Sequence, residues 1–351
     1  MVIRAAIVGA GYMGTAHARI INRIASENPS LVELDYVIDK DISRARRVAA
    51  IYGGKPLASI SDLPRGSVDL AFVAVPTRLH LEVFHQLASR DISAFFIEKP
   101  LAASIEEAEN ILRVAEENSL WVSAGHVERF NPAVIALHKL VAEGRLGKLF
   151  TLVSRRVGPF APRAGDTDVV YDLGVHEIDN VLALLARIPD YIKAYTIGSI
   201  VSDLNDYALL VMRFEKTFAS IEVNRITPFK QRILYITGSK AVAFLDYRSQ
   251  DLYVYTPWEE SKILFKREEP LYLEDLSVIE SLAKKEAPVV DVYQGFTPIL
   301  LGALGLEHGG EKQYLEKILA NYQDYLDKAL KGYRRYRVYV EKVSEKLLYY
   351  Y

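Results

Sequence analysis

The sequence contains no cysteine, which excludes disulfides, thiol catalysis and cysteine-based metal sites. A chain without disulfides fits a reducing cytosol. Methionine is also scarce, with 3 residues, whereas charged residues make up 25% of the chain. Few thermolabile residues together with many lysines, arginines and glutamates favour a thermophilic source.

Long hydrophobic runs and one-sided charge are likewise missing. No apolar stretch is long enough to cross a bilayer, and the N-terminus lacks the charged-then-apolar pattern of a signal peptide, so we expect a cytoplasmic protein. The formal net charge is -2 at pH 7, and no concentrated basic block precedes the C-terminal tail. We therefore expect a small molecule as partner, and neither nucleic acid nor a membrane.

What is present is a long globular chain of 351 residues, half of them hydrophobic, for which two cores are expected. Up to residue 124 strand and helix patterns alternate, which predicts a doubly wound parallel sheet. The expected strands are 3–8, 34–38, a short one near Leu57, 68–75, 92–97 and 120–124. The expected helices run from the first glycine turn to Ile24 and over 42–52, 79–89 and 104–118.

The turn after the first strand reads Gly9-Ala10-Gly11-Tyr12-Met13-Gly14. In a dinucleotide fingerprint the three glycines permit the tight turn, the approach of the pyrophosphate and close helix packing. The next strand ends in Asp39, where the fingerprint needs an acid for the ribose hydroxyls. An acid there repels the extra phosphate of NADP, although Arg44, Arg46 and Arg47 on the following helix weaken that preference. NAD is favoured.

Two further strands end in residues suited to a site at the carboxyl edge of the sheet, where ligands of such folds collect. One ends at Pro76-Thr77, with His80 a turn further on, and the other at Glu98-Lys99-Pro100. The alternatives are a surface histidine for His80 and a solvated charge pair for Glu98 and Lys99.

Beyond Gly147 the pattern changes to period-two segments joined by short turns, which predicts an open, mainly antiparallel sheet. We expect helices 175–187 and 274–286 to cover one face of it. Within Tyr171 to Asp179, Asp172 and His176 share a helical face with Asp179 close by. This spacing suits acid-base chemistry, and a core or capping histidine is an equal alternative; a metal site is disfavoured because a second cluster of ligands is not evident.

Together, in this order and spacing, these motifs resemble the glucose-fructose oxidoreductase and inositol dehydrogenase family, often called Gfo/Idh/MocA, over roughly residues 1–308. The resemblance implies a Rossmann-type NAD-binding domain over 1–124 and an α+β substrate-binding and oligomerisation domain over 125–310. It implies cofactor contacts from Gly9, Gly11, Tyr12, Met13, Gly14, Asp39, Pro76, Thr77, His80, Glu98, Lys99 and Pro100.

The same resemblance implies that Lys99, Asp172 and His176 meet at the nicotinamide. A secondary alcohol would lose hydride to the nicotinamide while His176 accepts the hydroxyl proton. Lys99 would stabilise negative charge on the oxygen, and Asp172 would orient His176. The other classes that remain open are an NAD-binding regulator without chemistry and a reductase of imines or double bonds.

The segment Gly125 to Pro132 is similar to that of family members acting at C3 of UDP-N-acetylglucosamine-type sugars. A nucleotide sugar needs cations for its diphosphate, and Arg155, Arg156 and Arg163 are the candidates for this role. A free cyclic polyol such as inositol is the alternative substrate. The alternative for the arginines is that they are exposed at the edge of the sheet and bind no substrate. The candidate substrate contacts are Arg129, Asn131, Arg155, Arg156, Arg163 and Asp179.

Residues 311–351 depart from the family pattern and form a predicted helical extension. Apolar residues recur at three- and four-residue steps from Leu315 to Leu347, broken only by Gly332, which predicts one or two amphipathic helices. We expect this tail to lie on its own domain or on a neighbouring subunit. A homodimer or homotetramer, formed through the open sheet or the tail, is the expected assembly.

Overall fold

A computed structural model describes residues 2–160, 167–307 and 312–348. The chain divides into two compact units, each with its own core. The first unit comprises residues 1–125 and 271–296, and the second comprises 126–270 and 297–351. The segment 271–296 lies within the predicted second domain, yet it groups with the first unit.

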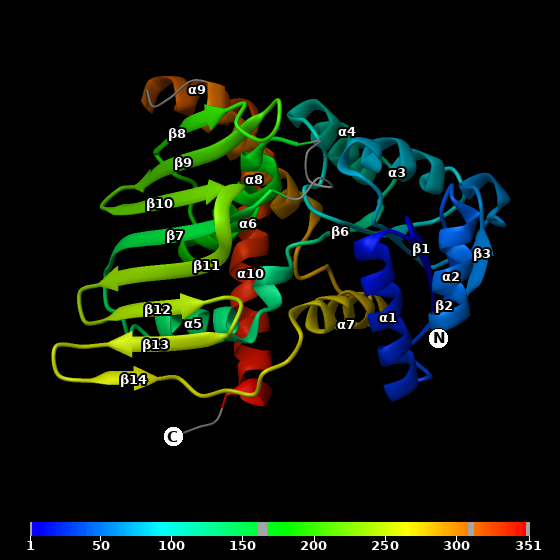
Figure 1. Ribbon diagram of the computed structural model, residues 1–351, viewed down its shortest axis with the longest axis horizontal. Coiled ribbons are helices and arrows are strands. Elements are labelled where there is room, and N and C mark those ends of the chain that lie inside the picture. Colours follow the sequence, from blue (N-terminus) through cyan, green and yellow to red (C-terminus); the bar gives the residue numbers. More distant parts are fainter. Residues whose placement is uncertain (1, 161–166, 308–311, 349–351) are drawn as a thin grey trace. The chain divides into compact units, whose positions relative to one another are not determined.

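The first unit is built on a six-stranded sheet in the order β3-β2-β1-β4-β5-β6, with all neighbouring strands parallel (Figure 1). β4 and β5 are apolar throughout and fully buried, as expected of central strands covered on both faces. The predicted Rossmann-type sheet is confirmed. Its strands are β1 (Ile3–Val8), β2 (Val32–Ile38), β3 (Lys55–Leu57), β4 (Leu70–Val73), β5 (Ala94–Ile97) and β6 (Trp121–Ala124).

Two α-helices of the first unit begin where a short polar side chain accepts a hydrogen bond from a free amide of the first turn. Asp41 accepts from Ser43 at the start of α2, and Ser104 accepts from Glu107 at the start of α4. The helical elements are α1 (Tyr12–Glu27), η1 (Ile60–Asp62), α2 (Ile42–Tyr52), η2 (Thr77–Leu79), α3 (His80–Ala88), α4 (Ile105–Glu117) and α7 (Pro270–Ala283).

Helix α7 corrects one expectation. Its pattern predicted a helix over 274–286 that covers the antiparallel sheet, but Asp275 of α7 forms an ion pair with His17 of α1 inside the first unit. An apolar stripe shows that a helix face is buried and carries no information about its partner.

The second unit is built on an eight-stranded sheet in the order β14-β13-β12-β11-β7-β10-β9-β8. β7 and β10 run parallel and every other neighbouring pair is antiparallel, so the predicted open, mainly antiparallel sheet is confirmed. β14, the last strand along the chain, was not predicted. The strands are β7 (Leu149–Pro159), β8 (Tyr191–Gly198), β9 (Asn205–Phe214), β10 (Thr217–Asn224), β11 (Ile226–Gly238), β12 (Val242–Asp246), β13 (Asp251–Tyr255) and β14 (Glu260–Lys262).

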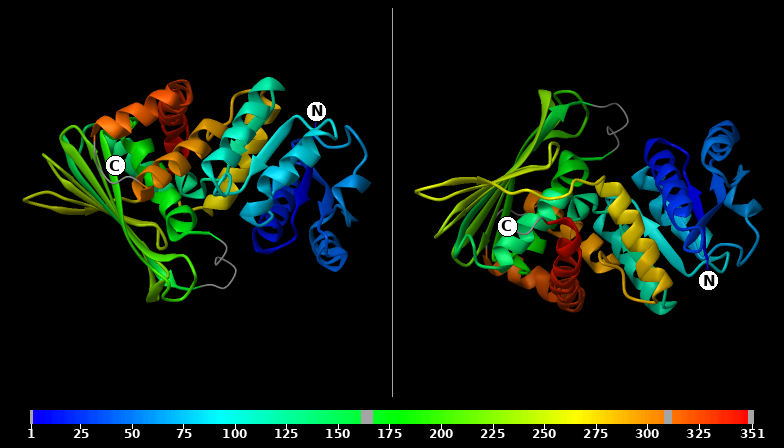
Figure 2. Two further views of the ribbon diagram at one scale, coloured as in Figure 1. Left: turned by 90° about the horizontal axis from the view of Figure 1, so that it is seen from above. Right: turned by 90° about the horizontal axis from the view of Figure 1, so that it is seen from below.

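Helices of the second unit lie on one face of this sheet, and the other face is left uncovered by the described elements of the unit (Figure 2). β9 shows the reason, because its side chains alternate between buried and half-exposed along the whole strand. The helical elements are η3 (Val127–Phe130), α5 (Pro132–Ala142), η5 (Val170–Gly174), α6 (Val175–Leu185), α8 (Val292–Glu307), α9 (Lys312–Asn321) and α10 (Gln323–Leu347).

The tail packs on its own unit, where α10 lies against α5 and α6. Gly332 does not break it, because α10 is continuous from Gln323 to Leu347 and the interruption falls at Tyr322. Gly332 is buried within the helix, which lets a neighbouring element approach its backbone. Among the helices that the structure describes, none combines the length and apolarity needed to cross a membrane.

Candidate cofactor and catalytic site

The glycine turn after β1 has the backbone geometry that its sequence predicts. Gly9 has φ +98°, and a Cβ on it would lie 2.6 Å from the carbonyl oxygen of Ala74. A Cβ on Gly14 would lie 1.7 Å from the carbonyl oxygen of Gly9. A Cβ on Gly11 meets no atom within 4 Å, so this residue, at the N-cap of α1, faces open space. The free amides of α1 are therefore open to an anionic ligand.

A hollow of about 590 Å³ adjoins this turn within the first unit. Its size suits part of a dinucleotide, and its cations suit phosphate. Tyr12 is 70% exposed beside it. Of the three arginines expected on α2, Arg44 and Arg47 line the hollow, and Arg44 also pairs with Asp41 at 3.3 Å. The lining residues are Ala10, Gly11, Tyr12, Thr15, Ala16, Arg19, Arg44, Arg47 and Tyr52.

Asp39 lies directly beside the glycine turn. One carboxylate oxygen accepts from the amide of Ala10 at 2.7 Å and the other from the amide of Asp41 at 2.8 Å. Each oxygen keeps a further lone pair, which leaves Asp39 able to accept from ribose hydroxyls. The turn, the hollow and this acid together fit NAD.

Lys99 follows β5 at the carboxyl edge of the sheet. Val73 and Ile97 are paired neighbours at the ends of β4 and β5, and the amide of Glu98 donates to the carbonyl of Val73 at 3.0 Å. The peptide bond from Lys99 to Pro100 is cis, and the Lys99 side chain is half-buried. Pro76 is the N-cap residue of η2 and Thr77 begins it, with two residues between the end of β4 and Pro76, at the same edge. In parallel sheets this edge is where ligands bind.

His80 does not fit the cofactor contact predicted for it. It is 1% exposed, and its Nε2 lies 3.0 Å from the carbonyl oxygen of Val75, while its Nδ1 lies 3.1 Å from that of Pro100. Burial lowers the pKa of His80. These contacts tie the loop after β4 to the loop after β5, which argues against both a surface position and a direct contact with the cofactor.

The carboxylate of Glu98 is also bonded inside the first unit. Its Oε1 lies 2.9 Å from Nε2 of His17, and its Oε2 accepts from the amide of Lys99 at 3.0 Å. The sequence interpretation missed His17, which lies on the face of α1 that also buries Ile20 and Ile24. A polar residue on an apolar helix face was the signal that could have found it.

Asp172 and His176 lie in the second unit, at the start of α6. Asp172 is half-buried in the π-helical turn η5, which continues directly into α6, where His176 is 8% exposed. The prediction assumed α-helical spacing between them, and the π-helical turn corrects it. Such turns inside helices are frequent at functional sites.

The next polar residues of α6 fix how this helix is rotated. Glu177 accepts from Nε of Arg156 at 2.5 Å, and Arg156 also donates to Glu128 at 2.7 Å. Burial alone would lower the pKa of Arg156, but the carboxylates of Glu177 and Glu128 outweigh it and raise the pKa. Glu177 was not predicted as a functional residue, because only the fold brings it close to Arg156 of β7.

Arg129 and Asp179 form a second buried pair. Two guanidinium nitrogens of Arg129 donate to the two carboxylate oxygens of Asp179 at 2.7 and 2.6 Å. The same guanidinium lies over the rings of Tyr333 and Tyr336, 4.6 and 4.9 Å from their centroids. Asn131 caps α5 and donates to the carbonyl of Tyr247.

These contacts bear on the substrate contacts predicted from the sequence. Arg129, Asn131, Arg156 and Asp179 are at most 2% exposed and have partners inside the unit, which argues against a role for them in binding substrate. Their common signal in the sequence, charge near a presumed cleft, does not distinguish a buried ion pair from a binding residue.

Two further arginines were predicted to bind substrate. Arg155 pairs with Glu222 at 2.8 Å and donates to Gln231, and the pleat of β7 points it away from the face on which Arg156 meets α6. Arg155 is therefore a sheet-face residue. Arg163 lies outside the described residues.

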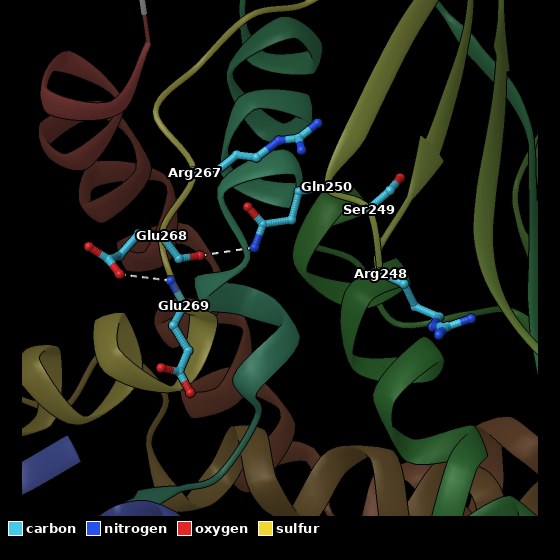
Figure 3. A pocket seen from close by; sticks show the side chains of 6 residues that line it. All are labelled: Arg248, Ser249, Gln250, Arg267, Glu268 and Glu269. Carbon is cyan, nitrogen blue, oxygen red and sulfur yellow. Dashed lines mark hydrogen bonds between the residues drawn. The ribbon is translucent and has the colours of Figure 1, made fainter. Parts of the chain in front are cut away.

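Another hollow, of about 540 Å³, lies where the turn after β12 meets the segment before α7 (Figure 3). Gln250 donates to the carbonyl of Glu268, and Arg267 pairs with Asp251 at 2.7 Å. Since its polar groups are of both signs and bonded within the unit, we assign it no ligand. Among the described residues, no cluster of three or more His, Cys, Asp or Glu side chains suits a metal ion.

The strand order, the open glycine turn and the acid after β2 define a Rossmann-type domain suited to binding NAD. Residues 3–126 match an oxidoreductase family with an NAD-binding Rossmann fold, and residues 134–244 match the GFO/IDH/MocA C-terminal domain. The chain belongs to the Gfo/Idh/MocA oxidoreductase family.

Several curated relatives carry dehydrogenase names. The UDP-N-acetylglucosamine 3-dehydrogenase of Acidithiobacillus ferrooxidans is 27% identical over 254 residues, which cover 72% of this chain and 77% of that protein. The inositol 2-dehydrogenase of Rhizobium meliloti is 27% identical over 218 residues, which cover 59% of this chain and 63% of that protein.

Solved structures support the fold. The structure of the Acidithiobacillus ferrooxidans enzyme matches with a TM-score of 0.77 at 24% identity and covers 87% of this chain and 97% of its own. A levoglucosan dehydrogenase in complex with NADH and levoglucosan matches with a TM-score of 0.79 at 16% identity, covering 86% and 96%. At these identities the likeness shows the shared two-part architecture.

Two glycine substitutions separate folding of the turn from cofactor binding. Gly14→Ala is expected to lower the melting temperature, since its Cβ overlaps the Gly9 carbonyl and such overpacking costs ~1–3 kcal/mol or more. Gly11→Ala is expected to keep the melting temperature, because its Cβ meets no protein atom within 4 Å. It is expected to weaken NADH binding, because the Cβ enters the space assigned to the pyrophosphate. Thermal unfolding and NADH fluorescence titration measure the two effects. Equal NADH affinity in Gly11→Ala and the unaltered chain would contradict the assigned pyrophosphate position.

Proposed function

We propose that this enzyme transfers hydride between NAD and a secondary hydroxyl of a sugar, and that its substrate is a nucleotide sugar of the UDP-N-acetylglucosamine type, oxidised at C3. The observation that carries the substrate class is the similarity to the UDP-N-acetylglucosamine 3-dehydrogenase, which extends over 72% of the chain. The assignment of NAD as the cofactor rests on the open turn at Gly11 and on Asp39.

Three side chains are proposed for the chemistry. Bound NAD supplies the acceptor for the hydride. His176 takes the hydroxyl proton, because imidazole titrates near neutral pH, and Asp172 orients it. Lys99 donates a hydrogen bond to the reacting oxygen and stabilises the negative charge that develops there. The half-buried position of Lys99 at the carboxyl edge of the sheet supports its role.

A free cyclic polyol such as inositol is the second candidate substrate. It is favoured by a specific observation: Arg155 and Arg156, two of the three arginines predicted to hold a diphosphate, have carboxylate partners inside the second unit. A neutral polyol needs no such cations. Relatives named inositol 2-dehydrogenase support the same alternative.

A substrate panel distinguishes these candidates. UDP-N-acetylglucosamine, UDP-glucose, myo-inositol and glucose are offered with NAD, and NADH formation is followed by absorbance. We expect the highest kcat/KM with UDP-N-acetylglucosamine. The highest value with myo-inositol would replace the nucleotide sugar by the polyol. A second panel offers carbonyls and imines with NADH, and NADH binding without turnover in either panel would support a regulatory protein.

We also propose that two or more copies associate through the uncovered face of the second sheet. Strand register places a row of side chains side by side across this face, and Val153 and Tyr235 in it are 46% and 42% exposed. An apolar patch that spans many strands is typical of an interface, and a second copy presents the same surface. The row is Tyr253, Phe244, Tyr235, Val153, Ser220, Val211 and Lys193.

Two charges placed in this row should separate the copies. The double substitution Val153→Glu and Tyr235→Glu is expected to reduce the mass in solution to that of one chain, 39.5 kDa. Size-exclusion chromatography with light scattering measures it. Trp258→Glu, at a 93% exposed residue between β13 and β14, is the control and should leave the assembly intact. A monomeric unaltered chain would contradict the proposal.

A further inference from the structure

His17 lies at the centre of a buried charge cluster in the first unit. Its Nδ1 is 2.9 Å from both carboxylate oxygens of Asp275 on α7, and its Nε2 is 2.9 Å from Oε1 of Glu98 after β5. The ring is 0% exposed and stands 5.3 and 5.0 Å from the rings of Phe72 and Phe96. The ring is therefore shielded from bulk solvent.

Both ring nitrogens face carboxylates, which accept hydrogen bonds and do not donate them when ionised. Burial alone would lower the pKa of His17, but the charges and hydrogen bonds of Asp275 and Glu98 outweigh it and raise the pKa well above its usual value. The ring is therefore an imidazolium that donates from both nitrogens. Burial alone would raise the pKa of Glu98, whereas the hydrogen bond from His17 outweighs it and lowers the pKa.

The cluster continues to the reacting lysine. The second oxygen of Glu98 accepts from the backbone amide of Lys99 at 3.0 Å. A chain of contacts thus runs from Asp275 through His17 and Glu98 to the backbone that carries the Lys99 side chain. It joins residues from three separate elements, α7, α1 and the end of β5.

We propose that His17 is a positioning residue, which holds the Glu98 carboxylate against the Lys99 amide and thereby fixes the direction in which the Lys99 side chain leaves the sheet edge. The inference rests on the proposed role of Lys99 in the reaction. A misplacement of about 1 Å in a reacting group costs roughly 10²-fold in rate, so a residue that touches neither substrate nor cofactor controls turnover through this contact.

The test begins with His17→Gln, which keeps a hydrogen-bonding side chain and removes the charge. We expect kcat to fall by roughly 10²-fold, with NADH affinity close to that of the unaltered chain. His85→Gln is the matched control, because His85 is exposed on α3 and its Nε2 lies 2.9 Å from Oδ1 of Asn110, away from the His17 cluster. It should leave kcat unchanged.

The pH profile separates positioning from a general structural role. The charged groups that face His17 are Asp275 from α7 and Glu98 from the end of β5. Glu98 itself is next to Lys99 and interacts electrostatically with His80 of α3, whereas Phe72 and Phe96 are uncharged. Without the imidazolium the pKa of Glu98 rises, so this carboxylate is protonated at higher pH. The acid limb of kcat/KM in His17→Gln is therefore expected to shift to higher pH. An equal loss at every pH, with a lowered melting temperature, would overturn the proposal.

A double substitution tests the route through Glu98. If His17 acts through this carboxylate, adding His17→Gln to Glu98→Gln lowers kcat little beyond Glu98→Gln alone. Multiplied losses would overturn the route. The amide resonance of Lys99 in 1H–15N spectra gives a readout that needs no turnover, and it should shift in His17→Gln and not in His85→Gln. An unshifted resonance overturns the inference even if the unaltered enzyme turns over no sugar, which separates its failure from that of the proposed function.

Discussion

Lys99→Ala and His176→Ala are each expected to lower turnover by ~10²- to 10⁴-fold, the usual loss when a positioned proton acceptor or donor is removed. NADH binding should change little, because neither residue belongs to the glycine turn, lines the hollow beside it or bonds to Asp39. Rapid-mixing absorbance with saturating substrate measures turnover, and fluorescence titration measures NADH affinity.

Matched substitutions sharpen this test. Lys55→Ala, at an exposed lysine of β3, should leave both quantities unchanged. His138→Ala is an unsuitable control, because His138 is buried against the Tyr336 ring with a pKa that burial lowers to about 3. Normal turnover in both Lys99→Ala and His176→Ala would remove these residues from the mechanism. Normal turnover in one alone would leave the other as the sole reacting group.

Asp179→Ala is expected to destabilise the second unit by ~3–5 kcal/mol, since it leaves the Arg129 guanidinium buried without its carboxylate. Arg129 is 0% exposed, and burial alone would lower its pKa, an effect that Asp179 outweighs and reverses. The loss should appear as faster hydrogen exchange in α5, α6 and α10, the helices around the pair. Urea unfolding followed by circular dichroism gives the free energy.

Two comparisons decide whether the pair itself is responsible. Glu117→Ala breaks the exposed pair with Arg113 on α4 and should change stability very little. Replacing both partners, Arg129→Met with Asp179→Leu, should recover much of the loss, because well-packed apolar groups remove the stranded charge. If the double variant is as unstable as Asp179→Ala, the loss arises from packing instead of charge.

The order of elements in the first unit was predictable because each strand and helix carries its own signal. β4 and β5 are short apolar runs, α4 begins at a serine that caps it, and the glycine turn encodes a backbone that other residues cannot adopt. The uncovered face of the second sheet was also predictable in outline, since period-two alternation indicates that one face of a sheet is buried and the other is exposed.

The partner of each buried polar residue was not predictable in this way. His17 and Asp275 are 258 positions apart in the sequence. The guanidinium of Arg129 lies over the rings of Tyr333 and Tyr336, which belong to the C-terminal helix α10. In the sequence Arg129 and Arg156 had the same appearance as substrate-binding arginines, because charge and residue type do not reveal burial. Accessible surface and a carboxylate within 3 Å distinguish the two roles, and both are properties of the fold.

The Gly9 to Gly14 turn, Asp39 and the Glu98-Lys99-Pro100 strand end were fixed by the sequence alone, because local backbone geometry and residue chemistry within a few positions determine them. The tertiary structure alone decided that Glu98 faces His17, that α7 completes the first unit, and that four of the predicted substrate contacts are interior ion pairs or caps. Long-range packing brings distant charges together, and the free energy of a buried charge depends on which neighbours that packing supplies.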